Sequence, residues 1–221
     1  MSHLEYWQTQ SDVEHFRKWN GNYNTDFKNH TRAYIKKKRH ETVLDCGAGL
    51  FSEYYGFKKD EINIKYTATE ITQKFIDIGI SAGIDVHECS IQRMPFKDKS
   101  YDVVLCHAVL NHQMDFKDGI DEMVRVAKKQ VIITFFKPFL EEPSAQKELN
   151  ISKNRFFVEE KEGVGVVVHR VLNEQGAPSC IYNFFSLHAI KKFLQEREYE
   201  YFFDQSHNTR FLFINKKQNG N

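Results

Sequence analysis

The sequence is poor in the residues that break or cross-link a chain. Its 221 residues include only 4 prolines, 11 glycines and 4 cysteines. With 41% hydrophobic and 14% aromatic residues, it is neither collagen-like nor compositionally disordered. The cysteines form no C-x-x-C pair, so neither a zinc knuckle nor a disulfide framework is indicated, and we expect reduced thiols. The composition is that of a globular chain with enough apolar surface for a core.

An excess of charge and a long apolar run are also missing. Lysine plus arginine number 31 against 30 aspartates and glutamates, so no global field favours a nucleic acid partner. The longest apolar stretches, residues 103–110 and 131–136, are far shorter than the roughly 20 residues that cross a bilayer. Residues 1–10 lack the apolar core of a signal peptide. We expect a cytoplasmic protein without a membrane span or a nucleic acid partner.

From residue 41 onward, short apolar runs alternate with amphipathic stretches. Expected strands cover residues 42–46, 66–69, 85–89, 101–106 and 130–136. Expected helices cover residues 51–57, 72–83 and 115–127. Such alternation predicts an α/β fold with a doubly wound, mostly parallel sheet.

We expect one domain, residues 1–221, in four parts. Residues 1–40 form a helical, aromatic lead that is either a lid over a ligand or a helix packed on the sheet, and residues 41–137 form the core. Residues 138–185 interrupt the alternation with a charged, helix-like stretch and then a β-hairpin, with strands at 164–171 and 180–185 around a turn at 173–178. Residues 186–216 add a helix and two strands, 200–204 and 210–215, which a tight turn at 206–209 forces to pair antiparallel. We expect the hairpin to cover an acceptor site rather than to complete the core.

In an open parallel sheet, ligands bind at the carboxyl ends of the central strands. Gly47 and Gly49 follow the first expected strand and allow close approach of the backbone to a ligand. Glu70 ends the second strand, where an exposed carboxylate accepts both hydroxyls of a ribose. These features indicate an adenosine ligand, but the third glycine of the dinucleotide fingerprint is replaced by Ser52.

Four stretches make the interpretation more specific: Val43-Leu44-Asp45-Cys46-Gly47-Ala48-Gly49, the run at 89–96 with Met94-Pro95-Phe96, the run at 100–104, and the run at 121–126. Together they resemble, over residues 42–136, the class I S-adenosylmethionine-dependent methyltransferases, and in particular the small-molecule "methyltransferase domain" group. The resemblance implies S-adenosylmethionine as cofactor. It also implies a Rossmann-like, seven-stranded sheet with an antiparallel last strand.

The resemblance implies roles for individual residues. Gly47, Ala48 and Gly49 pack against the methionine part of the cofactor, and Asp45 orients its ammonium group. The remaining cofactor contacts come from Glu70 and Ile71 at the ribose, Ser90 and Ile91 at the adenine, and His107 beside the methyl-donor pocket. Two positions depart from the family: Ser90 stands where relatives often carry Asp, and Phe51 where a third glycine is common.

Candidates for the acceptor side follow only from their positions relative to the expected strands. His107 and His112 flank the turn after the fourth strand, and each is a candidate general base or a packed histidine. Weak candidates for the substrate pocket are Tyr23, Phe136, Tyr182 and Asn183. We expect methyl transfer to a hydroxyl or an amine of a small polar metabolite or sugar-type acceptor.

Two other functions stay open. A nicotinamide-dependent oxidoreductase shares the glycine turn and Glu70, and a non-catalytic binding module would follow if Phe51 blocked the crevice. A metal site at Cys46, Cys89 and Cys106 is less favoured than buried thiols, so no metal is expected. Binding of S-adenosylhomocysteine rather than NAD would separate the first alternative from methyl transfer.

Overall fold

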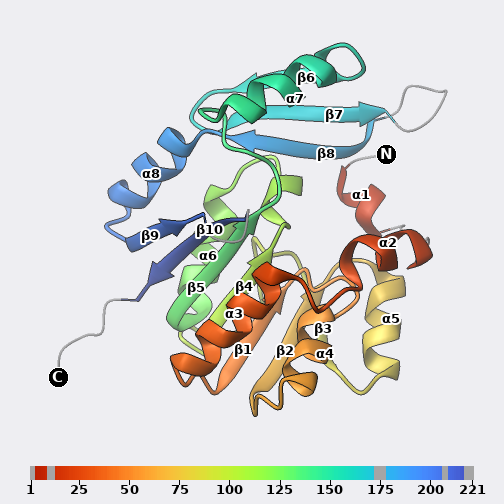
Figure 1. Cartoon of the computed structure of the whole chain (residues 1–221), viewed down its shortest axis with the longest axis vertical. Helices are drawn as coiled ribbons and strands as arrows, with labels where there is room; N and C mark the ends of the chain where they lie inside the picture. The colour runs from red at the N-terminus through yellow and green to blue at the C-terminus, as the bar shows by residue number, and fades with distance from the viewer. Residues whose placement is uncertain (1–2, 9–12, 172–177, 206–208, 217–221) are drawn as a thin grey trace.

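The computed structural model describes residues 3–8, 13–171, 178–205 and 209–216. It contains a large sheet with the strand order β3-β2-β1-β4-β5-β10-β9 (Figure 1). Its strands are β1 (Thr42–Cys46), β2 (Lys65–Glu70), β3 (Asp85–Glu88), β4 (Tyr101–His107), β5 (Ala127–Phe135), β9 (Glu200–Asp204) and β10 (Arg210–Asn215). The first five strands are parallel, and β10 runs antiparallel to both β5 and β9. The expected seven-stranded, Rossmann-like sheet is confirmed.

Helices cover both faces of the large sheet. The helices before and within its first half are α1 (His3–Gln8), α2 (Val13–Asn20), α3 (Asp26–Lys37), α4 (Ser52–Lys59) and α5 (Gln73–Ser81). The others are η1 (Leu110–His112), α6 (Lys117–Val126), α7 (Pro143–Lys153) and α8 (Leu187–Glu196). Apolar side chains of α3 and α4 pack on one face of the sheet, and those of α6 and α8 on the other. The described part of the chain contains no helix long and apolar enough to cross a membrane.

Strand alternation explains this two-sided burial. Successive side chains of a strand point to opposite faces. Accordingly, Val43 of β1 joins the α3–α4 core, whereas Leu44 and Cys46 face the α6–α8 core. The order of the strands reverses between β1 and β4: β2 and β3 lie on one side of β1, and β5 lies on the other side of β4. A ligand crevice is therefore expected where the carboxyl ends of β1 and β4 meet.

The segment at 138–185 is more than the hairpin expected from the sequence. It forms a second sheet of β6 (Phe157–Lys161), β7 (Gly165–Val171) and β8 (Pro178–Phe185), all antiparallel, together with α7 (Figure 1). The predicted hairpin is confirmed by the antiparallel pair β7–β8, and α7 lies in the charged, helix-like stretch before it, whereas β6 was not predicted. Phe139 at the start of this segment, Val164 between β6 and β7, and Phe185 at its end are at most 2% exposed and belong to the main core. Other buried side chains of β7, β8 and α7 form a separate cluster, so the hairpin joins the main core at its base, and its role as a cover over an acceptor site stays a prediction.

Phe51 lies in the core and not in the crevice. Its backbone is left-handed, with φ of +57° at the position before α4, which explains why glycine suits this position. Its ring is fully buried, and Cζ lies 2.5 Å from the position that a Cβ on Gly79 of α5 would take. Glycine at residue 79 makes room for the ring. The ring therefore supplies no reason to favour a blocked, non-catalytic module.

Two turns predicted from the sequence lie wholly or largely outside the described residues, at 173–178 and at 206–209. The strands that they join are described, and both pairs are antiparallel as expected. The helical character of the lead is confirmed by α1, α2 and α3.

Candidate functional site

The turn after β1 brings the backbone close to the expected crevice. Gly47 and Gly49 have positive φ values of +64° and +57°, a region that favours glycine. A Cβ added to Gly47 would come within 2.6 Å of Cγ2 of Val109, which follows β4. Between the glycines, the N–H of Ala48 donates to the carbonyl of Thr69 at 3.0 Å. The turn is held against β2 and leaves no room for a side chain on its β4 side.

Glu70 binds the same turn from the end of β2. Its carboxylate accepts hydrogen bonds from the N–H groups of Gly49 at 2.8 Å, Ile71 at 2.8 Å and Thr72 at 3.1 Å. The side chain is buried, so the expectation of an exposed carboxylate is wrong. Burial raises the pKa of Glu70, and the backbone donors oppose that rise. Glu70 therefore fixes the shape of the glycine turn. The ribose contact expected from the sequence would be a second role of the same carboxylate.

Asp45 is buried on the face of β1 that α3 and α4 cover. It accepts a hydrogen bond of 2.6 Å from the hydroxyl of Tyr66. Burial raises the pKa of Asp45 to about 6, although nearby His107 and the Tyr66 hydroxyl lower it. A carboxylate at this position is thus held partly protonated near neutral pH.

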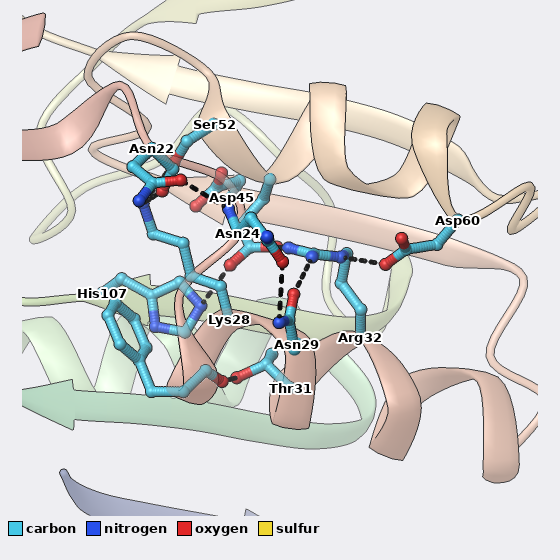
Figure 2. Close-up of polar contacts among 12 residues, drawn as sticks. Asn22, Asn24, Lys28, Asn29, Thr31, Arg32, Asp45, Ser52, Asp60 and His107 are labelled. Carbon is cyan, nitrogen blue, oxygen red and sulfur yellow. Dashed lines mark hydrogen bonds and ion pairs between the residues drawn. The ribbon is translucent and has the colours of Figure 1, made fainter. Parts of the chain in front are cut away.

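Asp45 belongs to a buried polar cluster that also contains Lys28, Arg32, Glu53 and His107. Figure 2 shows Lys28 and Arg32 extending from α3 toward Ser52 and Asp60 at the two ends of α4. Arg32 donates to Glu53 at 3.0 Å and to Asp60 at 2.6 Å. Lys28 Nζ donates to the hydroxyl of Ser52 at 2.7 Å, and burial lowers its pKa. The cluster links α3 to the first turn of α4, directly behind the glycine turn.

His107 completes this cluster. Its Nε2 lies 3.3 Å from Oε1 of Glu53, and its Nδ1 lies 3.1 Å from the hydroxyl of Thr134. The ring also packs edge-on against Phe27 of α3, and only 11% of the side chain is exposed. These contacts favour a supporting role beneath the turn over that of a general base.

The cluster gives a stability prediction for Asp45→Asn. The pKa of Asp45 is raised, so its contribution to stability is full below its ordinary value of 3.8 and is lost as the pH rises to about 6. Two pKa units correspond to about 3 kcal/mol. We therefore expect the variant to gain stability relative to the wild type, by up to about 3 kcal/mol, between pH 4 and pH 7. Urea unfolding at several pH values measures this difference.

Asp102→Asn is the matched control, because Asp102 is also a buried strand aspartate. Lys129 and the N–H of Glu41 donate to Asp102, and its pKa is lowered rather than raised. The stabilising contribution of Asp102 is present above its ordinary pKa and is lost in acid. Relative to the wild type, Asp102→Asn should therefore become less stable as the pH rises. Parallel pH profiles for the two variants would contradict the assignment.

A second group of residues lies beside the crevice at the end of β4. His112 of η1 stacks on Phe136, with ring centroids 5.1 Å apart and an interplanar angle of 29°. Trp7 of α1 contacts the same imidazole edge-on, at 4.7 Å. The carbonyl of Trp7 accepts a hydrogen bond of 2.8 Å from the hydroxyl of Thr72. Its buried Nε1 has no hydrogen-bond partner among the described residues. Trp7 thus connects the end of β2 to η1.

The expected adenine side is an ordered loop after β3. The Ser90 hydroxyl accepts a weak hydrogen bond from the N–H of Gln92 at 3.3 Å, while the side chain of Ile91 is buried. Farther along, Glu122 of α6 accepts from the N–H of Met94 at 2.6 Å, and Arg125 donates to the carbonyl of Met94 at 3.1 Å. This clamp explains how the Met94-Pro95-Phe96 run and α6 form one unit.

The four substrate-pocket candidates do not lie together. Phe136 contacts η1 through His112, and Asn183 donates to the carbonyl of Gln113, directly after η1. Tyr182 instead faces α7, where its hydroxyl lies 3.0 Å from Oγ of Ser152. The ring of Tyr23 lies 5.1 Å from Nζ of Lys59, near the end of α4. Phe136 and Asn183 stay candidates for the acceptor site on this geometry, whereas Tyr182 and Tyr23 have other contacts.

The strand-end thiols do not form a metal site with other ligands. No group of three or more His, Cys, Asp or Glu side chains in the described ranges could hold a metal ion. Cys46 and Cys106 are buried, and burial raises the pKa of Cys106 to about 12. For partly buried Cys89, burial raises the pKa to about 11. These groups therefore stay protonated thiols at neutral pH.

Several residues at the site carried no signal in the sequence. They are Trp7, Lys28, Glu53 and Asn111, which reach the site from α1, α3, α4 and η1. Lys28 and Glu53 resembled ordinary charged positions on amphipathic helices. The only useful sign was the aromatic composition of the lead, which left a lid as one of two readings.

A family model and curated proteins match the central part of the chain. Residues 44–135 match the family model described as "Methyltransferase domain". The sarcosine/dimethylglycine N-methyltransferase of Aphanothece halophytica is 29% identical over 103 residues, which cover 43% of this chain and 37% of that protein. The matched stretch thus spans about two fifths of the length of the curated relatives.

Solved structures extend the likeness of fold over most of the chain. A Thermotoga maritima protein described as a possible histamine N-methyltransferase has a TM-score of 0.59 at 14% identity, covering 98% of this chain and all of that one. The 1,6-didemethyltoxoflavin-N1-methyltransferase of Burkholderia thailandensis, solved with its substrate and S-adenosylhomocysteine, has a TM-score of 0.52 at 13% identity. That likeness covers 83% of this chain and 75% of the other.

Proposed function

We propose that the chain is a class I S-adenosylmethionine-dependent methyltransferase and that it transfers the cofactor's methyl group to an amine of a small polar acceptor. The observation that carries the proposal is the position of Trp7. Its carbonyl bonds Thr72 beside Glu70, and its ring contacts His112. The glycine turn and the proposed acceptor side therefore lie within reach of one tryptophan.

The residues present fit the cofactor. The glycine turn offers backbone without a Cβ, and buried Trp7 Nε1 is a donor that a bound polar group can satisfy. We propose that Gly47, Ala48 and Gly49 border the methionine part, with Asp45 behind them. For the adenosine part, we propose Glu70 and Ile71 at the ribose and Ser90 and Ile91 at the adenine. When bound, S-adenosylmethionine supplies an electrophilic methyl carbon on a sulfonium.

On the acceptor side, this chain has to align a nucleophile, exclude water and remove a proton. We propose His112 as the general base, because His107 lies between Glu53 and Thr134 in the buried cluster. Proton removal frees the lone pair with which an amine attacks. A hydroxyl acceptor would depend on the same base.

Two observations support an amine. The rings of Trp7 and Phe136 beside His112 suit a cationic ammonium, which is attracted to aromatic faces. The Aphanothece halophytica protein is an N-methyltransferase by name, and the Thermotoga maritima protein is described as a possible one.

Ligand binding tests the cofactor half of the proposal. At about 100 times its dissociation constant, S-adenosylhomocysteine should stabilise the protein by about 2.7 kcal/mol, or roughly 5 to 10 °C in Tm. NAD at the same concentration should give no shift. The reverse result would favour an oxidoreductase and overturn the proposal. Methyl transfer from labelled cofactor to a panel of small amines and matched alcohols then tests the acceptor class.

A further inference from the structure

The second sheet is hydrogen-bonded to the segment that carries His112. Nδ2 of Asn111 donates to the carbonyl of Asn183 in β8 at 2.8 Å, and Nδ2 of Asn183 donates to the carbonyl of Gln113. Oδ1 of Asn111 accepts from the N–H of Phe136 at 3.2 Å. Both asparagines are at most 1% exposed. These bonds join β8, η1 and the end of β5 across a buried interface.

The same interface determines which nitrogen of His112 carries the proton. Nδ1 of His112 lies 2.9 Å from the carbonyl oxygen of Ile181 in β8. A carbonyl only accepts, so Nδ1 is the protonated nitrogen of the neutral ring and Nε2 carries the lone pair. Phe136 stacks on this imidazole and limits its rotation. A base needs both a fixed orientation and a fixed tautomer.

We propose that Asn111 and Asn183 are positioning residues that lock η1 to β8, so that the Ile181 carbonyl holds His112 with its lone pair on Nε2. The second sheet thereby acts in catalysis through His112 and is more than a cover. This inference rests on the proposed function, in which His112 is the base.

The physical reason lies in the size of η1. It has only three residues, too few for its own backbone hydrogen bonds to fix it. The two asparagine amides hold the residues before and after His112: Asn111 donates to the carbonyl of Asn183, and Asn183 donates to the carbonyl of Gln113. Without either amide, a buried carbonyl loses its donor, which favours a rearranged segment. His112 then loses its constant distance from Ile181, and the second tautomer becomes populated.

The test uses Asn183→Thr, which suits a strand but is too short to reach Gln113, and Asn111→Leu, whose side chain has the same branching and number of heavy atoms as asparagine but no polar group. The first readout is the pair of ring ¹⁵N chemical shifts of His112 in the cofactor-free protein. We expect one tautomer in the wild type and a mixture in both variants. The second readout is kinetic: kcat should fall at least about tenfold, while the affinity for S-adenosylhomocysteine changes less than about twofold.

Ser152→Ala is the matched control. Ser152 is buried and bonds the Tyr182 hydroxyl on the α7 side of β8, away from η1. The control should lose comparable stability and keep both the wild-type tautomer and kcat. A single, unchanged tautomer in the folded asparagine variants would overturn the inference.

The two proposals fail in different ways. A tautomer change in both asparagine variants supports the positioning role even if no methyl transfer is found, because it is measured without cofactor or acceptor. If the tautomer changes and kcat does not, while His112→Asn also keeps full kcat, the role of His112 as base in the proposed function is overturned.

Discussion

At saturating cofactor, His112→Asn is expected to lower kcat by about 100-fold or more, the usual contribution of a general base. Asparagine can place its Nδ2 near the position of Nδ1 and keep the hydrogen bond to the carbonyl of Ile181. It has no atom that takes a proton at the position of Nε2. A general base acts in its neutral form, which makes kcat rise with pH, and this rise should be absent from the variant. Initial rates across pH measure both effects.

Two comparisons separate catalysis from folding. His112→Gln places a polar atom near Nε2 and loses the bond to Ile181, so it should be as slow as His112→Asn but less stable. His107→Gln removes the imidazole beside Oε1 of buried Glu53, whose other oxygen still accepts from Arg32, so its main effect should be a loss of stability of about 1 to 3 kcal/mol. A large loss of kcat and of its pH dependence in His107→Gln, with a near-normal His112→Asn, would transfer the role of base to His107.

The sequence was sufficient to predict the large sheet because its signals are local. Each strand is a short apolar run, and the glycines after β1 and the turns between units divide the runs into βα pairs. Antiparallel pairing of β9 and β10 followed from the short connection alone. The same reasoning missed β6, because Phe157–Lys161 contains three charged residues at an edge of the small sheet. An edge strand does not need two apolar faces.

The candidate site was predictable only where strand ends define it. Glu70, Asp45 and the glycines could be placed from the order of the strands. Their environments could not, since the burial of Glu70 depends on three N–H groups that any sequence supplies. The contact between Asn111 and Asn183 joins residues 72 positions apart, and no signal in the sequence pairs the predicted hairpin with the turn after β4. Position along a strand indicates a site, but contacts between distant segments decide which histidine serves it.

Glu70→Gln is expected to weaken S-adenosylhomocysteine binding at least tenfold and to destabilise the fold by about 1 to 3 kcal/mol. One carboxylate oxygen accepts from Gly49, and the other accepts from Ile71 and Thr72. A glutamine has one acceptor oxygen, so its amide N–H must face one of these backbone donors. The glycine turn is then released on one side. Calorimetry and urea unfolding at one pH measure the two losses.

A double cycle, in which both the ligand and Glu70 are changed, separates the effect of the ribose contact from the effect of the shape of the turn. We expect removal of both ribose hydroxyls from S-adenosylhomocysteine to weaken binding to the wild type by about 1 to 3 kcal/mol, because a charged acceptor loses its donors. In Glu70→Gln the same removal should cost much less, so the two changes should be non-additive. Glu122→Gln, which alters a carboxylate that accepts from the N–H of Met94, controls for loop damage and should leave the ribose effect intact. Equal losses in the wild type and in Glu70→Gln would show that Glu70 acts only by holding the turn, and the ribose hydroxyls would then need another partner.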